Sequence, residues 1–172
     1  MKSVKNTIFA FAVSLVAVGA MAQDKKDVVD IAIGSADHTT LVAAVKAADL
    51  VTTLKGTGPF TVFAPTNAAF AKLPAGTVEM LLKPENKSAL AGILTYHVVA
   101  GNLDATKVLA AIKGGMGKVV LTTVAGGKLT ASIEGGKVIL TDEKGGKATG
   151  TATDLKGSNG VIHVIDTVVM PK

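Results

Sequence analysis

The chain contains no cysteine, no tryptophan and no arginine. Without cysteine it can form no disulfide, use no thiolate nucleophile and carry no lipid on a cysteine side chain. Without arginine it lacks the bidentate side chain that reads guanine edges and grips phosphate, and few aromatic rings are present to stack on bases. These absences argue against nucleic acid as a partner.

Motifs that signal catalysis are also missing. The three histidines, His38, His97 and His163, are scattered, with no His-x-His or His-Glu-x-x-His spacing for zinc. No Gly-x-Ser-x-Gly segment supplies a serine nucleophile. We therefore predict that the protein is not an enzyme, with no catalytic residues, no metal and no cofactor.

The N-terminus has the pattern of a secretory signal peptide. Lys2 and Lys5 precede an apolar run over residues 8–18, which ends at Ala20-Met21-Ala22. This run is shorter than the roughly 20 residues that a membrane-spanning helix needs. We expect a signal peptide over residues 1–22, cleavage after Ala22, and export to the periplasm or the extracellular space without a membrane span.

The remaining chain, residues 23–172, is predicted to be one domain. About 150 residues suffice for a single core, and that core must be mainly aliphatic because aromatic residues are rare. Without Lys2 and Lys5, 16 of the 18 lysines face 13 acidic residues, so the net charge is only +3. This mild charge indicates no particular polyanionic partner.

The first half of this domain reads as helical. Apolar residues recur on one face over 37–48, where Asp37 or Thr39 would cap a helix, and again over 86–95. Between these helices, residues 58–65 form a short strand bracketed by two prolines.

The second half, after Gly101, reads as β-structure. Gly-Gly-Lys occurs at 126–128, 135–137 and 145–147, at intervals typical of turns in a meander of short strands. If Gly135-Gly136 is a two-residue turn, Ile133 faces Val138 and the apolar side chains of both strands share one face. The apolar segment 158–171 predicts a buried terminal strand.

Three segments resemble the signature segments of the fasciclin domain family. They are Thr61-Val62-Phe63-Ala64-Pro65-Thr66-Asn67-Ala68-Ala69-Phe70, the Tyr96-His97 segment over residues 93–101, and Asn159-Gly160-Val161-Ile162-His163-Val164-Ile165-Asp166. The resemblance implies a compact α+β wedge in which a helical N-terminal half packs on a β-sandwich formed mainly by the C-terminal half. The first and last segments would lie side by side at its centre.

The resemblance also implies a function. Members of this family have no common enzymatic activity, and some are adhesion modules in which an Asp-Ile pair ahead of the last signature segment, together with the tyrosine-histidine segment, takes part in integrin recognition. Asp154 and Leu155 occupy the matching positions here. We therefore predict adhesion or protein-protein interaction at the cell envelope or extracellular matrix, through Asp154 and Leu155, with Tyr96 and His97 joining if exposed. The alternative for Asp154 is a loop residue that caps a turn.

His97 and His163 lie in apolar sequence, where an imidazole needs hydrogen-bond partners. Because the resemblance brings the signature segments together, we predict a structural polar network that contains Thr66, Asn67, His163 and Asp166.

A second hypothesis is a periplasmic carrier of a small apolar ligand, such as haem or a lipid, held between the helices and the sandwich. The aliphatic composition of the predicted core is compatible with such a ligand. For either function we expect a monomer or a weak oligomer.

Overall fold

The computed structural model describes residues 25–172. The predicted signal peptide, residues 1–22, lies outside the described residues.

Seven strands form one mixed sheet in the order β2-β1-β7-β6-β5-β4-β3. Neighbouring strands are antiparallel except for β1 and β7, which are parallel and place Thr61 beside Val161. The strands are β1 (Phe60–Pro65), β2 (Val98–Ala100), β3 (Lys118–Thr122), β4 (Lys128–Glu134), β5 (Lys137–Thr141), β6 (Lys147–Gly157) and β7 (Gly160–Ile165).

The sheet curves until its two end strands approach each other. Val99 at the β2 end forms an isolated antiparallel bridge with Thr123, just beyond β3. The long strand β6 permits this curvature, because its pairing with β7 contains two register shifts and irregularities of this kind bend a strand. The fold is therefore α+β, with one nearly closed sheet, and the predicted division into two stacked sheets of a sandwich is not confirmed.

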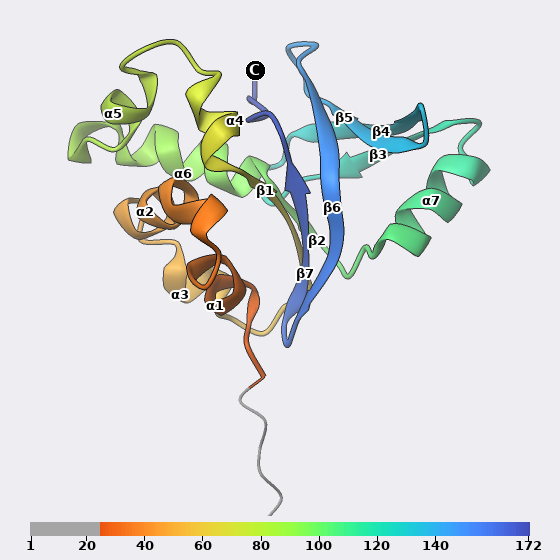
Figure 1. Cartoon of the computed structure of the whole chain (residues 1–172), viewed down its shortest axis with the longest axis horizontal. Coiled ribbons are helices and arrows are strands. Elements are labelled where there is room, and N and C mark those ends of the chain that lie inside the picture. Colours follow the sequence, from red (N-terminus) through yellow and green to blue (C-terminus); the bar gives the residue numbers. More distant parts are fainter. Residues whose placement is uncertain (1–24) are drawn as a thin grey trace, which may run out of the picture.

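Most helices belong to the N-terminal half of the chain, and they cover β1 and β7 from one side (Figure 1). The helix α7 packs against β3 and β4 on the other side (Figure 1). The helical elements are α1 (Val28–Ile33), η1 (Ala36–His38), α2 (Thr39–Ala47), α3 (Val51–Leu54), α4 (Asn67–Ala71), α5 (Thr77–Leu81), η2 (Pro84–Asn86), α6 (Lys87–Tyr96) and α7 (Ala105–Gly114).

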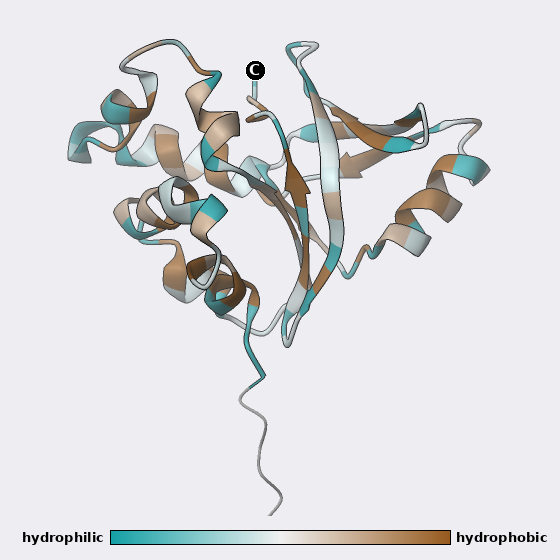
Figure 2. Cartoon of the chain, viewed as in Figure 1, coloured by the Kyte–Doolittle hydropathy of each residue, from teal (hydrophilic) through white to brown (hydrophobic). Residues whose placement is uncertain are grey.

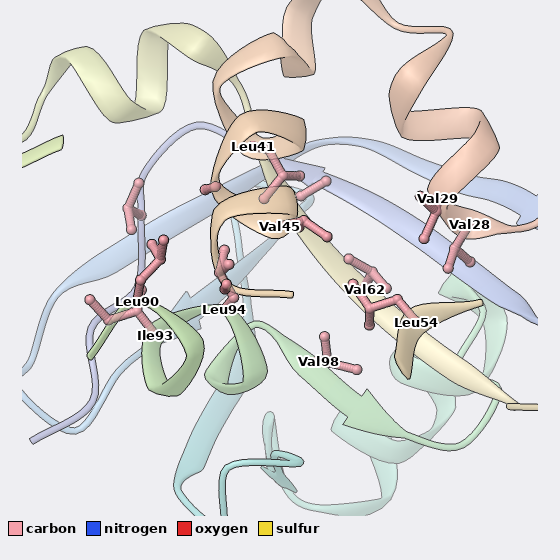
Figure 3. Packing of buried hydrophobic residues seen from close by; sticks show 14 of the residues in the cluster. Val28, Val29, Leu41, Val45, Leu54, Val62, Leu90, Ile93, Leu94 and Val98 are labelled. Carbon is pink, nitrogen blue, oxygen red and sulfur yellow. The ribbon is translucent and has the colours of Figure 1, made fainter. Parts of the chain in front are cut away.

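Two clusters of buried apolar side chains result. The first lies between the helices and the sheet, where Leu41 and Val45 of α2 meet Leu94 of α6 and Val62 of β1 (Figure 3). The second fills the inside of the curved sheet under α7 and is mostly aliphatic. The hydrophobic stretches of β7 and α7 in Figure 2 belong to these interiors. All six residues of β7 are buried, which confirms the predicted burial of this segment.

The predicted hairpin at Gly135-Gly136 is confirmed in its register. Ile133 pairs with Val138, as expected for a two-residue turn. The strand expected within 58–65 and the helices expected within 37–48 and 86–95 are also present, as β1, α2 and α6.

Two local predictions were wrong. The segment after Gly101 is not wholly β, because α7 begins where the Asp104 carboxylate accepts a hydrogen bond from the Lys107 N–H at 2.9 Å. Neither Asp37 nor Thr39 caps α2. Instead Asn67, from α4, accepts a hydrogen bond from the Thr40 N–H at 3.0 Å, so the cap comes from a distant part of the chain.

Within the described residues, no helix combines the length and the apolar character that crossing a bilayer requires.

Candidate binding groove

An open polar groove of about 530 Å³ lies at one end of the sheet. It is formed by the α3–β1 loop, the loop after β2 and the β6–β7 turn, and the first and last of these lie together in Figure 1. The lining residues are Lys55, Gly56, Thr57, Gly58, Pro59, Asn102, Gly157, Ser158, Asn159 and Gly160.

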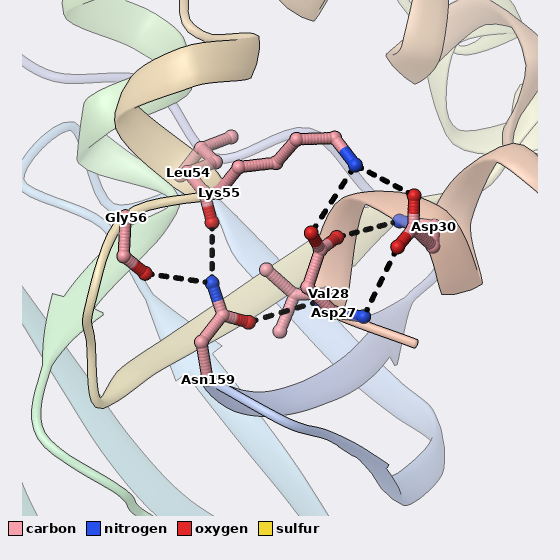
Figure 4. Close-up of polar contacts among 7 residues, drawn as sticks. All are labelled: Asp27, Val28, Asp30, Leu54, Lys55, Gly56 and Asn159. Carbon is pink, nitrogen blue, oxygen red and sulfur yellow. Dashed lines mark hydrogen bonds and ion pairs between the residues drawn. The ribbon is translucent and has the colours of Figure 1, made fainter. Parts of the chain in front are cut away.

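Asn159, in the β6–β7 turn, holds the first wall of the groove (Figure 4). Its Nδ2 donates to the carbonyl oxygens of Leu54 at 2.7 Å and Gly56 at 3.0 Å. Its Oδ1 accepts a hydrogen bond from the Val28 N–H at 3.1 Å. One amide side chain therefore connects the turn, the α3–β1 loop and the start of α1.

Glycines allow the turn and this loop to touch. A Cβ on Gly58 would collide with the Asn159 carbonyl oxygen, and one on Gly160 would collide with the Phe60 carbonyl oxygen. Backbone therefore packs directly on backbone at the floor of the groove.

Lys55 is the charged residue that lines the groove, and its charge is matched. Its ammonium group lies 3.2 Å from the Asp27 carboxylate and 2.7 Å from that of Asp30, which also form the capping box of α1 (Figure 4). These contacts raise the pKa of Lys55 and lower that of Asp30. The pairs are exposed, so they orient α1 more than they stabilise the fold.

Thr61 and His163 hold the second wall, which is the loop after β2. The Thr61 hydroxyl donates to the Gly101 carbonyl oxygen at 2.7 Å and accepts from the Leu103 N–H at 2.9 Å. The His163 Nε2 lies 2.6 Å from the Leu103 carbonyl oxygen, which assigns the proton to this nitrogen. Both side chains are buried and both come from signature segments named above.

Asp154 anchors the far end of the same loop. Its carboxylate accepts a hydrogen bond from the Ala105 N–H, the first residue of α7, at 2.8 Å. Its backbone has a φ of 62°, in the left-handed region, so the side chain leaves β6 at an irregular point of the strand. The next residue, Leu155, is 39% exposed.

Tyr96 does not reach the surface. It is fully buried, and its hydroxyl donates to the Lys128 carbonyl oxygen at 2.7 Å and accepts from the Glu143 N–H at 3.2 Å. Burial raises the pKa of this phenol. The side chain thus lies beneath the turns that flank β4 and β5.

His97 is also enclosed, with 2% exposure. Its Nδ1 donates to the Ile93 carbonyl oxygen at 2.8 Å, and its Nε2 accepts from the Val169 N–H at 3.2 Å. Burial lowers the pKa of His97 to about 4, so the ring is neutral at physiological pH. The exposure that the predicted role of Tyr96 and His97 required is absent, because α6 leads directly into β2 inside the fold.

Thr66, Asn67, His163 and Asp166 make separate hydrogen bonds, and none of the four bonds to another. Thr66 caps α4 through the Ala69 N–H. Asn67 also donates to a carbonyl of η1, and Asp166 accepts from a backbone N–H on β6. Each side chain connects its own neighbouring elements, and the four do not form one shared network.

The pKa of Asp166 results from opposing effects. Burial acts to raise its pKa, but hydrogen bonds from the Thr149 N–H and the Thr167 hydroxyl, and the Lys72 ammonium group at 3.7 Å, lower it on balance.

The groove presents groups that form hydrogen bonds. Its lining offers hydroxyl, amide and backbone groups and one paired lysine. Over residues 25–172, no group of three or more His, Asp or Glu side chains is placed to hold a metal ion. The arrangement suits hydrogen bonding to a polar surface or an extended peptide.

Sequence reasoning missed Asn159 and Thr61 as parts of a site. It assigned Asn159 to a turn and Thr61 to a strand. The available signal was the presence of a polar residue within an otherwise apolar signature segment, but the partners of both lie far away in the sequence.

Comparison with known proteins gives consistent results. The fasciclin domain model matches residues 36–171. Protein sll1483 of Synechocystis sp. is 51% identical over 144 residues, which cover 84% of this chain and 73% of that protein. The transforming growth factor-beta-induced protein ig-h3 of Sus scrofa is 39% identical over 145 residues, which cover 84% of this chain but 19% of that protein.

A solved structure shares the fold. It is a FAS1 domain pair from the insect cell adhesion molecule fasciclin I, with a TM-score of 0.51 and 24% identity, covering 74% of this chain and 40% of that one. From the family match, the identity to these relatives and the shared fold, we conclude that the chain belongs to the fasciclin domain family.

Proposed function

We propose that this protein is exported and non-enzymatic and that it binds a protein partner at the cell envelope or in the extracellular matrix, using the polar groove as its contact surface. The observation that carries the proposal is the separate anchoring of the two groove walls, one by Asn159 and the other by Thr61, His163 and Asp154. A relative of the same fold is a cell adhesion molecule, which supports the same class of function.

The rigidity of the groove favours binding. Loops that are ordered before contact lose little conformational entropy when a partner arrives, so more of the contact energy appears as affinity. Polar loops without anchors would lose that advantage. The part-buried hydrogen bonds of Asn159, Thr61 and Asp154 offset the conformational entropy that is lost when these loops become ordered.

Asp154 and Leu155 remain part of the proposed site, in different roles. The Asp154 carboxylate is already engaged by Ala105, so it acts by positioning the second wall. Leu155 does not line the groove. It is exposed on β6 beside Ile31 and Ser35, and its apolar side chain can make a separate contact with the partner.

The surroundings of the groove favour an acidic partner. Lys25, Lys26 and Lys156 are exposed. The carbonyl oxygen of Lys26 accepts a hydrogen bond from the Ser158 N–H at 2.9 Å, which places this segment next to the β6–β7 turn. Such exposed charges mainly raise the association rate, so binding should weaken as salt concentration rises.

The test begins with cross-linking in intact cells of the source organism to identify a partner, followed by affinity measurements with purified proteins. Thr57→Trp places a bulky ring in the groove at an exposed position, and Asp154→Ala releases the second wall. Both variants should bind at least about tenfold more weakly, which corresponds to about 1.4 kcal/mol.

Thr122→Trp is the matched control, because Thr122 is exposed on β3 and does not line the groove. This variant should bind the partner like the wild type. Unchanged affinity of Thr57→Trp and Asp154→Ala, with native stability, would remove the groove from consideration.

For the alternative function, a carrier of haem or lipid, the apolar cavity is small. The apolar cavity between the helices and the sheet measures about 40 Å³, whereas sites for drug-sized ligands span about 300–1,000 Å³. A haem would require displacement of the helices.

A further inference from the structure

Asn159 is followed by glycine, and it is the only asparagine of the sequence with this neighbour. The side-chain amide of an asparagine can react with the backbone nitrogen of the next residue, and a glycine leaves that nitrogen accessible because it has no side chain. Asparagine is among the thermolabile residues of proteins. The other four asparagines, Asn6, Asn67, Asn86 and Asn102, precede larger residues. The β6–β7 turn therefore holds the asparagine that is chemically most prone to lose its amide.

The reaction forms a five-membered ring. The Gly160 nitrogen bonds to Cγ of Asn159, the bond from Cγ to Nδ2 breaks, and Nδ2 leaves as ammonia with the proton of the Gly160 amide. Water then opens the resulting succinimide at either of its carbonyl groups. One product has aspartate at this position, and the other has isoaspartate, in which the chain continues through the side-chain carbon. Overall, one water is consumed and one ammonia is released.

The fold restrains both reacting groups. The three hydrogen bonds of the Asn159 side chain direct its amide toward α1 and the α3–β1 loop (Figure 4). The peptide group between Asn159 and Gly160 is held as well, since its carbonyl oxygen accepts a hydrogen bond from the Phe60 N–H at 3.0 Å. Ring closure turns the amide back onto its own chain, so the bonds of the side chain must open first.

The first wall of the groove can open without unfolding of the sheet. Native proteins open in local units whose free energies lie below that of global unfolding. The helix α1 has six residues, which is too short for stability on its own. The ion pairs that connect Lys55 to α1 are exposed and contribute little. Asn159 is therefore reactive during the fraction of time in which this wall is open.

Neither product restores the wall. In aspartate an oxygen replaces Nδ2, which lies 2.7 Å from the Leu54 carbonyl oxygen and 3.0 Å from that of Gly56. Both carbonyls would lose their donor and face a third acceptor. In isoaspartate the backbone gains one atom ahead of Gly160, where even an added Cβ would collide with the Phe60 carbonyl oxygen. The turn has no room for the longer backbone.

We propose that Asn159 is a site of spontaneous deamidation, at which opening of the first wall admits the reaction and the product keeps the wall open. The conversion is one-way because ammonia is lost. It changes each molecule once, from a form with an anchored first wall to a form in which that wall is loose. The chemistry needs only water, and it does not depend on whether the groove binds a partner.

The first test is to age the purified protein in mildly alkaline buffer, where loss of the Gly160 amide proton accelerates ring closure. Mass spectrometry of the tryptic peptide that follows Lys156 distinguishes asparagine, aspartate and isoaspartate. We expect conversion at Asn159 and an intact amide at Asn102, which is exposed but precedes leucine. Conversion should be at least about tenfold faster in protein unfolded by urea, because the folded protein reacts only while open. Equal rates in the two states, or conversion in urea alone, would overturn the proposal.

Hydrogen exchange tests the effect of the product on the wall. Aged protein should exchange faster than fresh protein in α1 and in the α3–β1 loop, and Asn159→Asp should show the same pattern without ageing. Asn159→Gln would have to close a six-membered ring, which is much slower, so its exchange should not change on ageing. Unchanged exchange in fully converted wild type would show that the product does not loosen the wall.

Two proline variants separate the first wall from general loosening. Val28 and Ala105 are the first residues of α1 and α7, where a helix tolerates proline. Val28→Pro removes the hydrogen bond to Asn159 and should accelerate deamidation about threefold to tenfold. Ala105→Pro removes the equivalent bond to Asp154 in the second wall and should leave the rate unchanged. Equal acceleration by both variants would contradict control by the first wall.

Discussion

His97 Nε2 accepts a hydrogen bond from the backbone N–H of Val169, 72 residues later in the chain. This contact fixes the C-terminal segment to the junction of α6 and β2. It requires an unprotonated Nε2, because a protonated imidazole has two N–H donors and no acceptor. The contact therefore makes the fold sensitive to acid.

We predict a loss of stability of about 3 kcal/mol from His97 as the pH falls from 6.5 to about 4. The unfolded chain takes up this proton with a pKa near 6.5, but burial lowers the pKa of the folded form to about 4. Between these values the unfolded state binds more protons, so protonation favours unfolding. Urea denaturation at a series of pH values measures the slope.

Burial also lowers the pKa of His38, so its contribution has the same sign. The two can be separated by following each imidazole ring with NMR in the folded protein. A titration of the His97 ring near pH 6.5, without unfolding, would contradict the prediction.

Asn159→Ala should destabilise the protein by about 2–3 kcal/mol. The change leaves the Val28 N–H and the carbonyl oxygens of Leu54 and Gly56 without their partner, and unpaired buried groups are costly. Amide hydrogen exchange should accelerate most in α1 and in the α3–β1 loop. Chemical denaturation measures the free energy.

Asn102→Ala is a control of the same chemistry. Asn102 is exposed and lines the same groove, and its side chain makes no hydrogen bond to the part of the chain that the structure describes. Its replacement should change stability by less than about 0.5 kcal/mol. Equal effects of the two changes would show that Asn159 does not anchor the wall.

The hairpin register could be predicted from the sequence because its cause is local. A Gly-Gly turn fixes which residues face each other, and alternation of apolar residues fixes the buried face, so Ile133 and Val138 pair as expected. The burial of β7 follows from its β-branched composition for a similar reason.

Other features depend on distant partners. Asn67 caps α2 from another helix, and the two walls of the groove are held by side chains that are remote in sequence from the loops they bind. Local patterns cannot specify which distant carbonyl will meet such a side chain. For α7 a local signal did exist, Asp104 ahead of Val108 and Ile112, but the prediction for the second half of the domain did not use it.

A pair of Gly→Ala changes should have opposite effects. A Cβ on Gly127 would lie 2.5 Å from the ring of Tyr96, which is fully buried and cannot move away, so Gly127→Ala should destabilise by about 1–3 kcal/mol. Gly92, inside α6, has open space around it, so Gly92→Ala should stabilise by about 0.5–1 kcal/mol. Thermal denaturation of both variants checks the two signs.

If Gly127→Ala proved neutral, the close packing of Tyr96 beneath the turn before β4 would be wrong. Fluorescence of Tyr96, the single tyrosine of the chain, gives a direct second measurement at this position.

Thr61→Val should lower the free energy of unfolding by about 2 kcal/mol, although the shape of the side chain is nearly preserved. The valine cannot donate to the Gly101 carbonyl or accept from the Leu103 N–H, so two groups in the second wall lose their partner. Because His163 donates to the carbonyl of the same Leu103, its ring resonances should shift as well.

Thr122→Val separates this effect from the general consequences of the substitution. Thr122 is exposed on β3, where valine is a good strand residue, so its replacement should change stability by less than about 0.5 kcal/mol. The resonances of His163 should then stay in place. If Thr61→Val behaved like Thr122→Val in both measurements, the second wall would not depend on the Thr61 hydroxyl, and Asp154 and His163 alone would hold that wall.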